Sequence, residues 1–172
     1  MKKIFLIFFL ILSYNNIVIA NTNVVFLDLQ KILSSSEPGL SILNQLNEIN
    51  TQNLNGFQND AKDLKEKENK LISQKNILSE ADFRSKANKL KLEIKNYNQN
   101  KKKIINDFNK LKIQSTNKFL EMINPIITNY SNEKSISMIL QKKYLILGKK
   151  ELDITNEIIQ IINENINEFK VK

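Results

Sequence analysis

The chain has 172 residues, 41% of them apolar and 26% charged, a balance that permits a folded core and excludes a polytopic membrane protein. It contains neither histidine nor cysteine. Catalytic triads built on these residues, thiolate or imidazole metal sites, and disulfides are therefore excluded. Its three glycines, Gly39, Gly56 and Gly148, lie too far apart for a phosphate-binding loop. We expect no enzyme activity, no cofactor, no bound metal and no nucleotide partner.

The N-terminus has the layout of a secretory signal peptide. Lys2 and Lys3 precede nine uninterrupted apolar residues, 4–12, and polar residues then lead to Ala20. A membrane anchor needs about 20 apolar residues to cross the hydrocarbon core, so this run is too short to be one. We expect residues 1–20 to be removed by cleavage after Ala20. The whole chain has a formal net charge of +8 at pH 7, which suits an exported protein that meets acidic polypeptides or anionic lipids, and we expect no nucleic-acid partner.

The middle of the chain, residues 40–122, predicts two long helices that pair with each other. It contains one glycine and no proline, and its apolar residues repeat every seven positions. The first series is Leu43, Phe57, Leu64, Leu71 and Leu78, with Asn50 as its polar member, and the second is Phe83, Leu90, Tyr97, Ile104 and Leu111. Between the two series, residues 79–82 form a Ser-Glu-Ala-Asp capping signal for a new helix. We place the tip of a helical hairpin there.

A reversal of the chain at residues 79–82 brings the two series into register. The expected pairs are Leu78 with Phe83, Leu71 with Leu90, Leu64 with Tyr97, and Phe57 with Ile104. Each helix of roughly 40 residues is then about 60 Å long. An arm so long and narrow encloses no core of its own, so the flanking segments must supply one.

The flanking segments predict a small body that contains three strands. Residues 23–27, 136–140 and 144–147 are short and apolar runs rich in strand-forming residues. Lys142 and Lys143 lie between the last two runs and are expected to form a turn.

Helices are expected around these strands. Residues 28–33 predict a short helix, and Asn124-Pro125 predicts a break or kink in the second arm helix. Thr155 is the predicted N-cap of a last helix that ends near Phe169.

The body, made of residues 21–39 and 123–172, is too small to be stable alone. We expect strands of several subunits to share one sheet or barrel, which also removes exposed strand edges. The predicted fold class is α+β, a long antiparallel helical hairpin (a coiled-coil arm) on a small β-containing oligomerisation body. The apolar residues expected to build this body are Val25, Phe26, Leu27, Ile136, Met138, Leu140, Leu145 and Leu147.

The arm carries the chain's excess of positive charge. Residues 40–120 include 16 basic and 9 acidic residues, so long-range attraction of acidic partners is expected. The candidate binding residues are Lys86, Lys89, Lys91, Lys95, Lys101, Lys102 and Lys103, together with Leu92 and Ile105, which are apolar yet lie off the hairpin seam. For each lysine the alternative is a solvated surface position without a partner. Gly56, inside the first arm helix, predicts a flexible point at residues 50–58.

Several segments, in this order and spacing, resemble the Skp (OmpH-like) family of periplasmic chaperones. They are the signal peptide, Val24 to Gly39, the charged hairpin, Asn124 to Ile127, the two later apolar runs of the body, and Asp153 to Ile159. The resemblance implies a periplasmic homotrimer with a shared β body and three helical arms around a cavity. It also implies ATP-independent holding of unfolded outer-membrane proteins during transit.

The leading hypothesis is therefore a holdase chaperone that prevents aggregation of outer-membrane proteins. The alternative is a structural coiled-coil adaptor of the cell envelope, whose hairpin docks on another component through its tip. At the tip, Lys75, Arg84 and Lys86 are opposed by Glu80 and Asp82, a departure from the strongly basic arm tips of the family. Anionic lipid or lipopolysaccharide stays a candidate partner of the tips.

Overall fold

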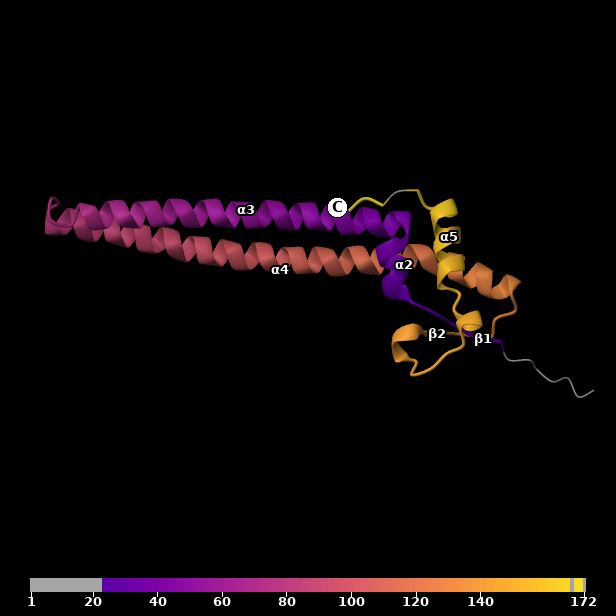
Figure 1. Cartoon of the computed structure of the whole chain (residues 1–172). Helices are drawn as coiled ribbons and strands as arrows, with labels where there is room; N and C mark the ends of the chain where they lie inside the picture. The colour runs from indigo at the N-terminus through magenta and orange to yellow at the C-terminus, as the bar shows by residue number, and fades with distance from the viewer. Residues whose placement is uncertain (1–22, 168, 172) are drawn as a thin grey trace, which may run out of the picture.

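A helical hairpin projects from a small α+β body in the computed structural model, which describes residues 23–167 and 169–171 (Figure 1). The predicted signal peptide lies outside the described residues. Among the helices of the described part, none is both long and apolar enough to cross a membrane. The predicted fold class, with its long helices and small sheet, is confirmed.

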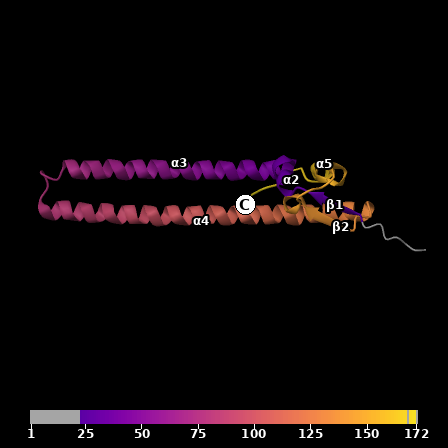
Figure 2. The ribbon, with the colours of Figure 1, turned by 60° about the horizontal axis from the view of Figure 1, so that its bottom comes forward.

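The arm consists of helices α3 (Glu37–Ser73) and α4 (Glu80–Glu133) joined by a loop at residues 74–79. Figures 1 and 2 show the two helices side by side from the body to the loop. The 37 residues of α3 correspond to a length of about 55 Å. Ser79 caps α4, because its hydroxyl accepts a hydrogen bond of 3.1 Å from the Asp82 amide. The loop that reverses the chain, residues 74–79, thus begins a few residues before the predicted tip at 79–82.

The register of the hairpin is as predicted for three of the four pairs, and the pair of Leu78 with Phe83 stays a prediction. Leu71 and Leu90 line one groove between the helices, and Leu64 and Tyr97 line the next. Phe57 and Ile104 line a third groove, nearer the body. The seven-residue repeat thus places each pair at the same height along the arm.

Of the break or kink predicted at Asn124-Pro125, the break is wrong, because α4 continues through Pro125 to Glu133, and the kink stays a prediction. Proline inside a helix removes one hydrogen bond and costs about 3 kcal/mol. The side chains on both sides of it are packed in the body: Phe119 and Ile123 are buried, and Tyr130 packs against the same core. Burial of several such side chains, each worth about 1.5–3 kcal/mol, exceeds that cost.

The sheet of the body has two parallel strands, β1 (Val24–Leu27) and β2 (Met138–Gln141). Val24 pairs with Met138, and Leu27 with Gln141. The strand predicted at 23–27 is confirmed, but the one predicted at 136–140 begins two residues later. The cause is a turn after α4, in which Ser135 has a φ of 51° and the Ile136 amide donates back to the Ser131 carbonyl.

The third predicted strand, residues 144–147, is wrong. The chain instead forms a short 3-10 helix, η1 (Lys142–Tyr144), an irregular stretch, and a second short helix, η2 (Lys150–Leu152). The free edge of β1 is already used, since Phe26 bridges to Asp153 and its carbonyl accepts from the Ile154 amide. Among the described residues the outer edge of β2 stays unpaired, but the chain turns away from it at η1, and the segment loops out into solvent.

The core lies where α2 (Leu29–Ser35), the start of α3, the end of α4 and α5 (Thr155–Asn165) meet. Its fully buried members come from all four helices: Ile32, Ile42, Phe119, Ile123, Ile158 and Ile162. The helix predicted at 28–33 is thus confirmed, with Asp28 as its N-cap.

The prediction for the last helix needs correction at both ends. Thr155 is the first residue of α5 and not its cap, and its hydroxyl instead accepts a 2.9 Å hydrogen bond from the Asp28 amide. The helix ends at Asn165 because the chain then turns back along the arm, where Phe169 is buried and its carbonyl accepts from Gln45.

Candidate functional site

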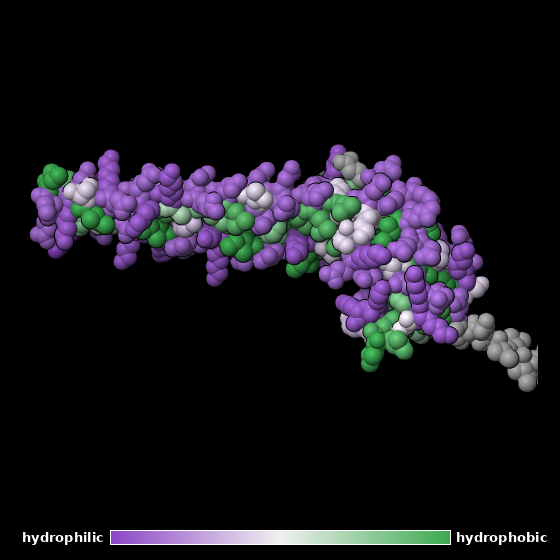
Figure 3. Space-filling view, viewed as in Figure 1, coloured by the Kyte–Doolittle hydropathy of each residue, from purple (hydrophilic) through white to green (hydrophobic). Residues whose placement is uncertain are grey.

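The arm presents a polar surface interrupted by apolar side chains. Figure 3 shows hydrophobic residues gathered along the line where the helices meet, with hydrophilic residues around them. Not all of the apolar side chains are covered by the partner helix. Those of the arm that remain exposed are Leu40, Leu54, Ile72, Ile77, Leu92, Ile94, Ile105 and Ile113. The arm thus leaves many of its large apolar side chains in contact with water.

The predicted lysines lie on one helix but do not form one cluster. Six of the seven are exposed on α4, and Lys101 is partly covered. Lys86 donates to the Gln74 amide oxygen at 3.2 Å, near the tip. The remaining ones, none of which forms an ion pair among the described residues, are Lys89, Lys91, Lys95, Lys102 and Lys103.

Near the tip, lysines of both helices surround a groove of about 240 Å³. Lys86 and Lys89 face Lys67 and Lys70 of α3 across it. Lys67 is neutralised locally, with its ammonium 2.8 Å from Asp63 and 2.9 Å from Glu93. Hydrogen bonds to these two carboxylates raise the pKa of Lys67 above its usual value. The groove therefore contains charges of both signs.

Nearer the body, a larger groove of about 440 Å³ opens between the arm helices. Its walls include the rings of Phe57, Tyr97 and Phe108, and the half-exposed side chain of Ile105. The Lys101 ammonium lies 5.4 Å from the centre of the Phe57 ring and 5.8 Å from that of Tyr97. Of the two apolar candidates from the sequence, Ile105 belongs to this groove, whereas Leu92 projects from α4 and is 57% exposed.

The sequence had placed Phe57 and Tyr97 in the seam of the hairpin. The structure keeps them there, but only half-buried. Asn50, the polar member of the heptad series, was the one signal that the seam is incompletely filled at this height.

The residues predicted for the oligomerisation body divide into three groups. Val25, Phe26 and Leu27 are buried within the chain's own fold. Ile136 and Leu145 are partly covered. The exposed members are Met138, Leu140 and Leu147.

The loop after β2 exposes further apolar side chains. Tyr144 is 75% exposed, Ile146 is fully exposed and Leu147 is 91% exposed. The loop is held at Gly148, where an added Cβ would lie 2.6 Å from the Phe26 ring. It thus presents a defined apolar surface.

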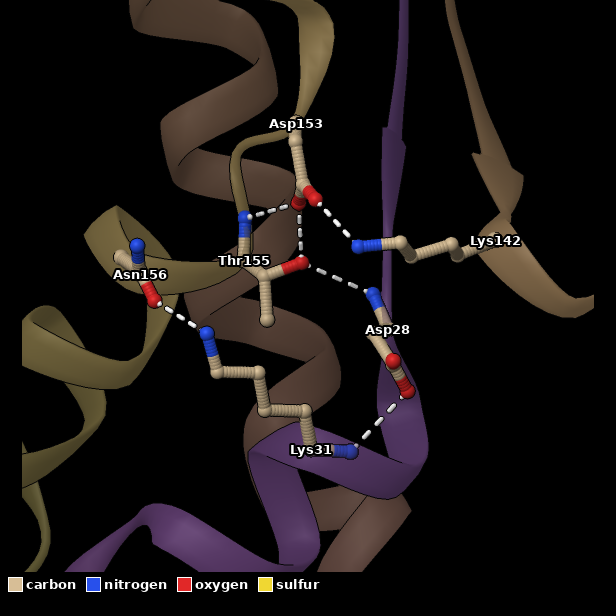
Figure 4. A network of polar contacts seen from close by, with 6 residues as sticks. All are labelled: Asp28, Lys31, Lys142, Asp153, Thr155 and Asn156. Atoms are coloured by element: carbon tan, nitrogen blue, oxygen red, sulfur yellow. Dashed lines mark hydrogen bonds and ion pairs between the residues drawn. The ribbon is translucent and has the colours of Figure 1, made fainter. Parts of the chain in front are cut away.

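A polar network fixes both ends of this loop to the body (Figure 4). Lys142 forms a 2.8 Å ion pair with Asp153, whose carboxylate also accepts from the amide and hydroxyl of Thr155. Burial opposes ionisation of Asp153, but the contacts with Lys142 and Thr155 outweigh it and hold its pKa below the usual value. On the other side of Thr155, Lys31 donates to Asn156 at 2.8 Å. The network links β1, α2, the loop and α5.

The network is not arranged as a metal site. Within residues 23–167 and 169–171, no three acidic side chains lie close enough to one another to hold a metal ion.

The family model described as outer membrane protein (OmpH-like) matches residues 23–162, which is most of the chain. The chain belongs to the OmpH-like family. No curated protein matches this chain. Among solved structures, the chain is similar to a candidate outer membrane chaperone (OmpH-like) from Caulobacter crescentus CB15, with a TM-score of 0.80 and 14% sequence identity over 88% of this chain and 89% of that one. At this identity the likeness shows the OmpH-like fold, and family and fold together support a chaperone role.

Proposed function

We propose that this protein is an ATP-independent periplasmic holdase, which binds unfolded outer-membrane proteins and prevents their aggregation during transit to the outer membrane. Residues 1–20 would direct its export and be removed after Ala20. Membership of the OmpH-like family supports a chaperone role, and the arm supports the binding of unfolded chains.

The observation that carries the proposal is the distribution of exposed apolar side chains and unpaired lysines along the arm. They recur from Ile113 near the body to Ile77 at the tip, with no single deep pocket. An unfolded chain offers no fixed shape, so its binding requires many weak contacts rather than one specific geometry. A long hairpin provides such contacts and remains folded because the body anchors it.

The charge of the arm suits acidic clients. We assign client contact to Lys86, Lys89, Lys91, Lys95, Lys101, Lys102 and Lys103, with Leu92 and Ile105 as apolar contacts. Exposed ammonium groups attract a carboxylate-rich chain over roughly 10 Å at 0.1 M salt, and this attraction weakens as salt increases. The aliphatic stems of the lysines extend the apolar surface offered to the client.

We further propose that the active form is a homotrimer, the number being that of the family which the sequence resembles. The body leaves Met138, Leu140, Ile146 and Leu147 exposed, an apolar surface that needs a cover in water. A neighbouring copy of the same body would supply that cover, and three arms would then surround a shared cavity.

An aggregation assay tests the holdase directly. The purified protein without its signal peptide is added to an outer-membrane β-barrel protein diluted from urea, without nucleotide, and light scattering is recorded. We expect aggregation to be suppressed near one oligomer per client, and more strongly at low salt. Absence of suppression at low salt would refute the proposal.

The alternative is a structural adaptor of the cell envelope, and one observation favours it. Ile72 and Ile77 are exposed at the tip, Ile77 by 81%, and two such residues offer an end-on docking point for a folded partner or a membrane. Because the client is held by many weak contacts along the arm, we expect Ile72→Asn together with Ile77→Asn to reduce aggregation suppression only slightly. A protein that loses binding to phosphatidylglycerol vesicles or lipopolysaccharide with this change, and suppresses no aggregation, would instead be an adaptor.

A further inference from the structure

The mid-arm groove, lined by Leu54, Phe57, Tyr97, Lys101, Ile105 and Phe108, differs from the other grooves of the arm in its chemistry. All side chains that line it belong to the described part of the chain. One of them is a lysine, and none is a carboxylate. The two grooves nearer the tip both include Glu93 and Lys67, which pair with each other. The mid-arm groove thus combines aromatic walls with a positive charge that has no opposite charge beside it.

The groove is open because the first arm helix has small or polar residues where the second helix has large ones. Asn50, Asn53 and Ala61 of α3 lie opposite Ile104 and its neighbours on α4. None of the three reaches far enough to fill the seam. The Tyr97 hydroxyl donates to the Phe57 carbonyl at 3.2 Å, which fixes the tyrosine ring as one wall. The cavity is therefore a consequence of sequence and not of a chance side-chain position.

The exposed fractions show that the groove is accessible. Leu54 on one wall is 50% exposed and Ile105 on the other is 43% exposed. Both would become buried if an apolar side chain entered between them. The Lys101 ammonium, placed over the Phe57 and Tyr97 rings, remains at the edge of the groove, where it can reach a carboxylate on the segment that enters.

We propose that the mid-arm groove is a specific docking site for segments of unfolded polypeptide in which an aromatic side chain stands next to an aspartate or glutamate. The aromatic ring stacks among Phe57, Tyr97 and Phe108, and the carboxylate pairs with Lys101. Aromatic pairs stabilise a complex by more than their buried area alone would give. A cation over an aromatic face, here the Lys101 ammonium, adds to the attraction. The inference rests on the proposed holdase function and names the site that recognises the client.

Matched variants on the second arm helix test the apolar half of the site. Ile105→Asn should weaken binding of a urea-unfolded β-barrel protein by about fivefold to tenfold, as expected for the loss of one aliphatic contact. The control is Leu92→Asn, which replaces a more exposed aliphatic residue of the same helix, 57% against 43% for Ile105, that lies outside the groove. It should change binding by less than about twofold. Where circular dichroism shows that Ile105→Asn unfolds the arm, Leu54→Asn on the opposite wall is measured instead.

Competition by short peptides tests the client chemistry and the charge. A ten-residue peptide that alternates phenylalanine with aspartate should displace the client. Replacing its phenylalanines by serine, or its aspartates by lysine, should abolish displacement. Lys101→Met should weaken binding of the peptide by more than Lys102→Met, which changes the neighbouring, exposed lysine outside the groove.

Environment-sensitive dyes locate the bound peptide, since the chain has no cysteine of its own. A dye at Gln58→Cys, in the groove, should shift to shorter wavelength on binding, whereas one at Gln99→Cys should not.

The outcomes separate the two proposals. If the wild-type protein suppresses aggregation but the Ile105 and Leu92 variants bind the client equally, the groove is not a specific site and the holdase function stands. If the wild-type protein suppresses nothing, the holdase fails, yet peptide binding that depends on Ile105 and Lys101 would still support the groove. If Ile105→Asn changes the mass in sedimentation equilibrium, a second copy of the chain occupies the groove and the proposal is wrong.

Discussion

Gly148 and Gly56 differ in what surrounds them, and this difference predicts opposite effects of the same substitution. A Cβ at position 148 would lie 2.6 Å from the buried Phe26 ring, whereas one at position 56 would meet nothing within 4 Å. We expect Gly148→Ala to destabilise the protein by about 1–2 kcal/mol through overpacking. Gly56→Ala should stabilise it by about 0.5–1 kcal/mol, because alanine favours the helix. Urea unfolding of both variants checks the signs, and an unchanged midpoint for Gly148→Ala would contradict the packing of the loop on Phe26.

Asp153 predicts a pH dependence of stability. Its pKa in the folded chain lies below the ordinary value of 3.8, since its contacts with Lys142 and Thr155 outweigh the effect of burial. The contribution is therefore present above the unfolded value and is lost as the pH falls through the folded value. We expect Asp153→Asn to lower the free energy of unfolding by about 1 kcal/mol at pH 7. The difference between wild type and variant should shrink below about pH 4, and a difference that is constant down to pH 3 would show that the ion pair contributes nothing.

At the scale of elements, the sequence predicted what local pattern determines. The seven-residue repeat and the Ser79 cap specify the two arm helices and their register, because both signals act within a few residues. The continuation of α4 through Pro125 could not be predicted, since it depends on burial of the same helix by distant segments. The strand expected at 144–147 did not form because the chain enters η1 at Lys142, where Lys142 pairs with the distant Asp153, a contact that the local pattern does not show.

The candidate site was predictable only in part. Charge counting found the lysines of α4, and the heptad pattern identified Leu92 and Ile105 as off the seam. The mid-arm groove could not be found in this way, because it arises from the pairing of small residues on α3 with large ones on α4. Such a cavity depends on two segments at once, and neither segment shows it alone.

Helix α3 predicts a flexible point in the middle of the arm. It continues through Gly56, where glycine lowers helix stability by about 1 kcal/mol relative to alanine. We expect the amides of residues 50–58 to exchange faster than those of residues 64–71, which contain no glycine. Gly56→Ala should slow the exchange. Equal protection of the two segments in the wild-type protein would contradict a flexible point at Gly56.

At the scale of the whole molecule, the exposed apolar loop of the body predicts self-association. Ile146→Asp together with Leu147→Asp places two charges on the surface proposed to lie between subunits, and burying unpaired charges is strongly unfavourable. Sedimentation equilibrium should show a trimer for the wild-type protein and a monomer for this variant. The control, Ile113→Asp on the arm, should remain a trimer. A wild-type protein that is a stable monomer at micromolar concentration would refute the shared body.

The distinction between a chaperone and an adaptor depends on whether the arm binds unfolded or folded proteins. The most direct measurement is the fluorescence anisotropy of one labelled outer-membrane β-barrel protein, titrated with this protein in two states without nucleotide. In the first state the barrel is freshly diluted from urea, and in the second it is folded in detergent micelles. Our account predicts saturable binding of the unfolded barrel, weakened by salt, and no binding of the folded one. Equal binding of both states, or binding of the folded barrel alone, would contradict it.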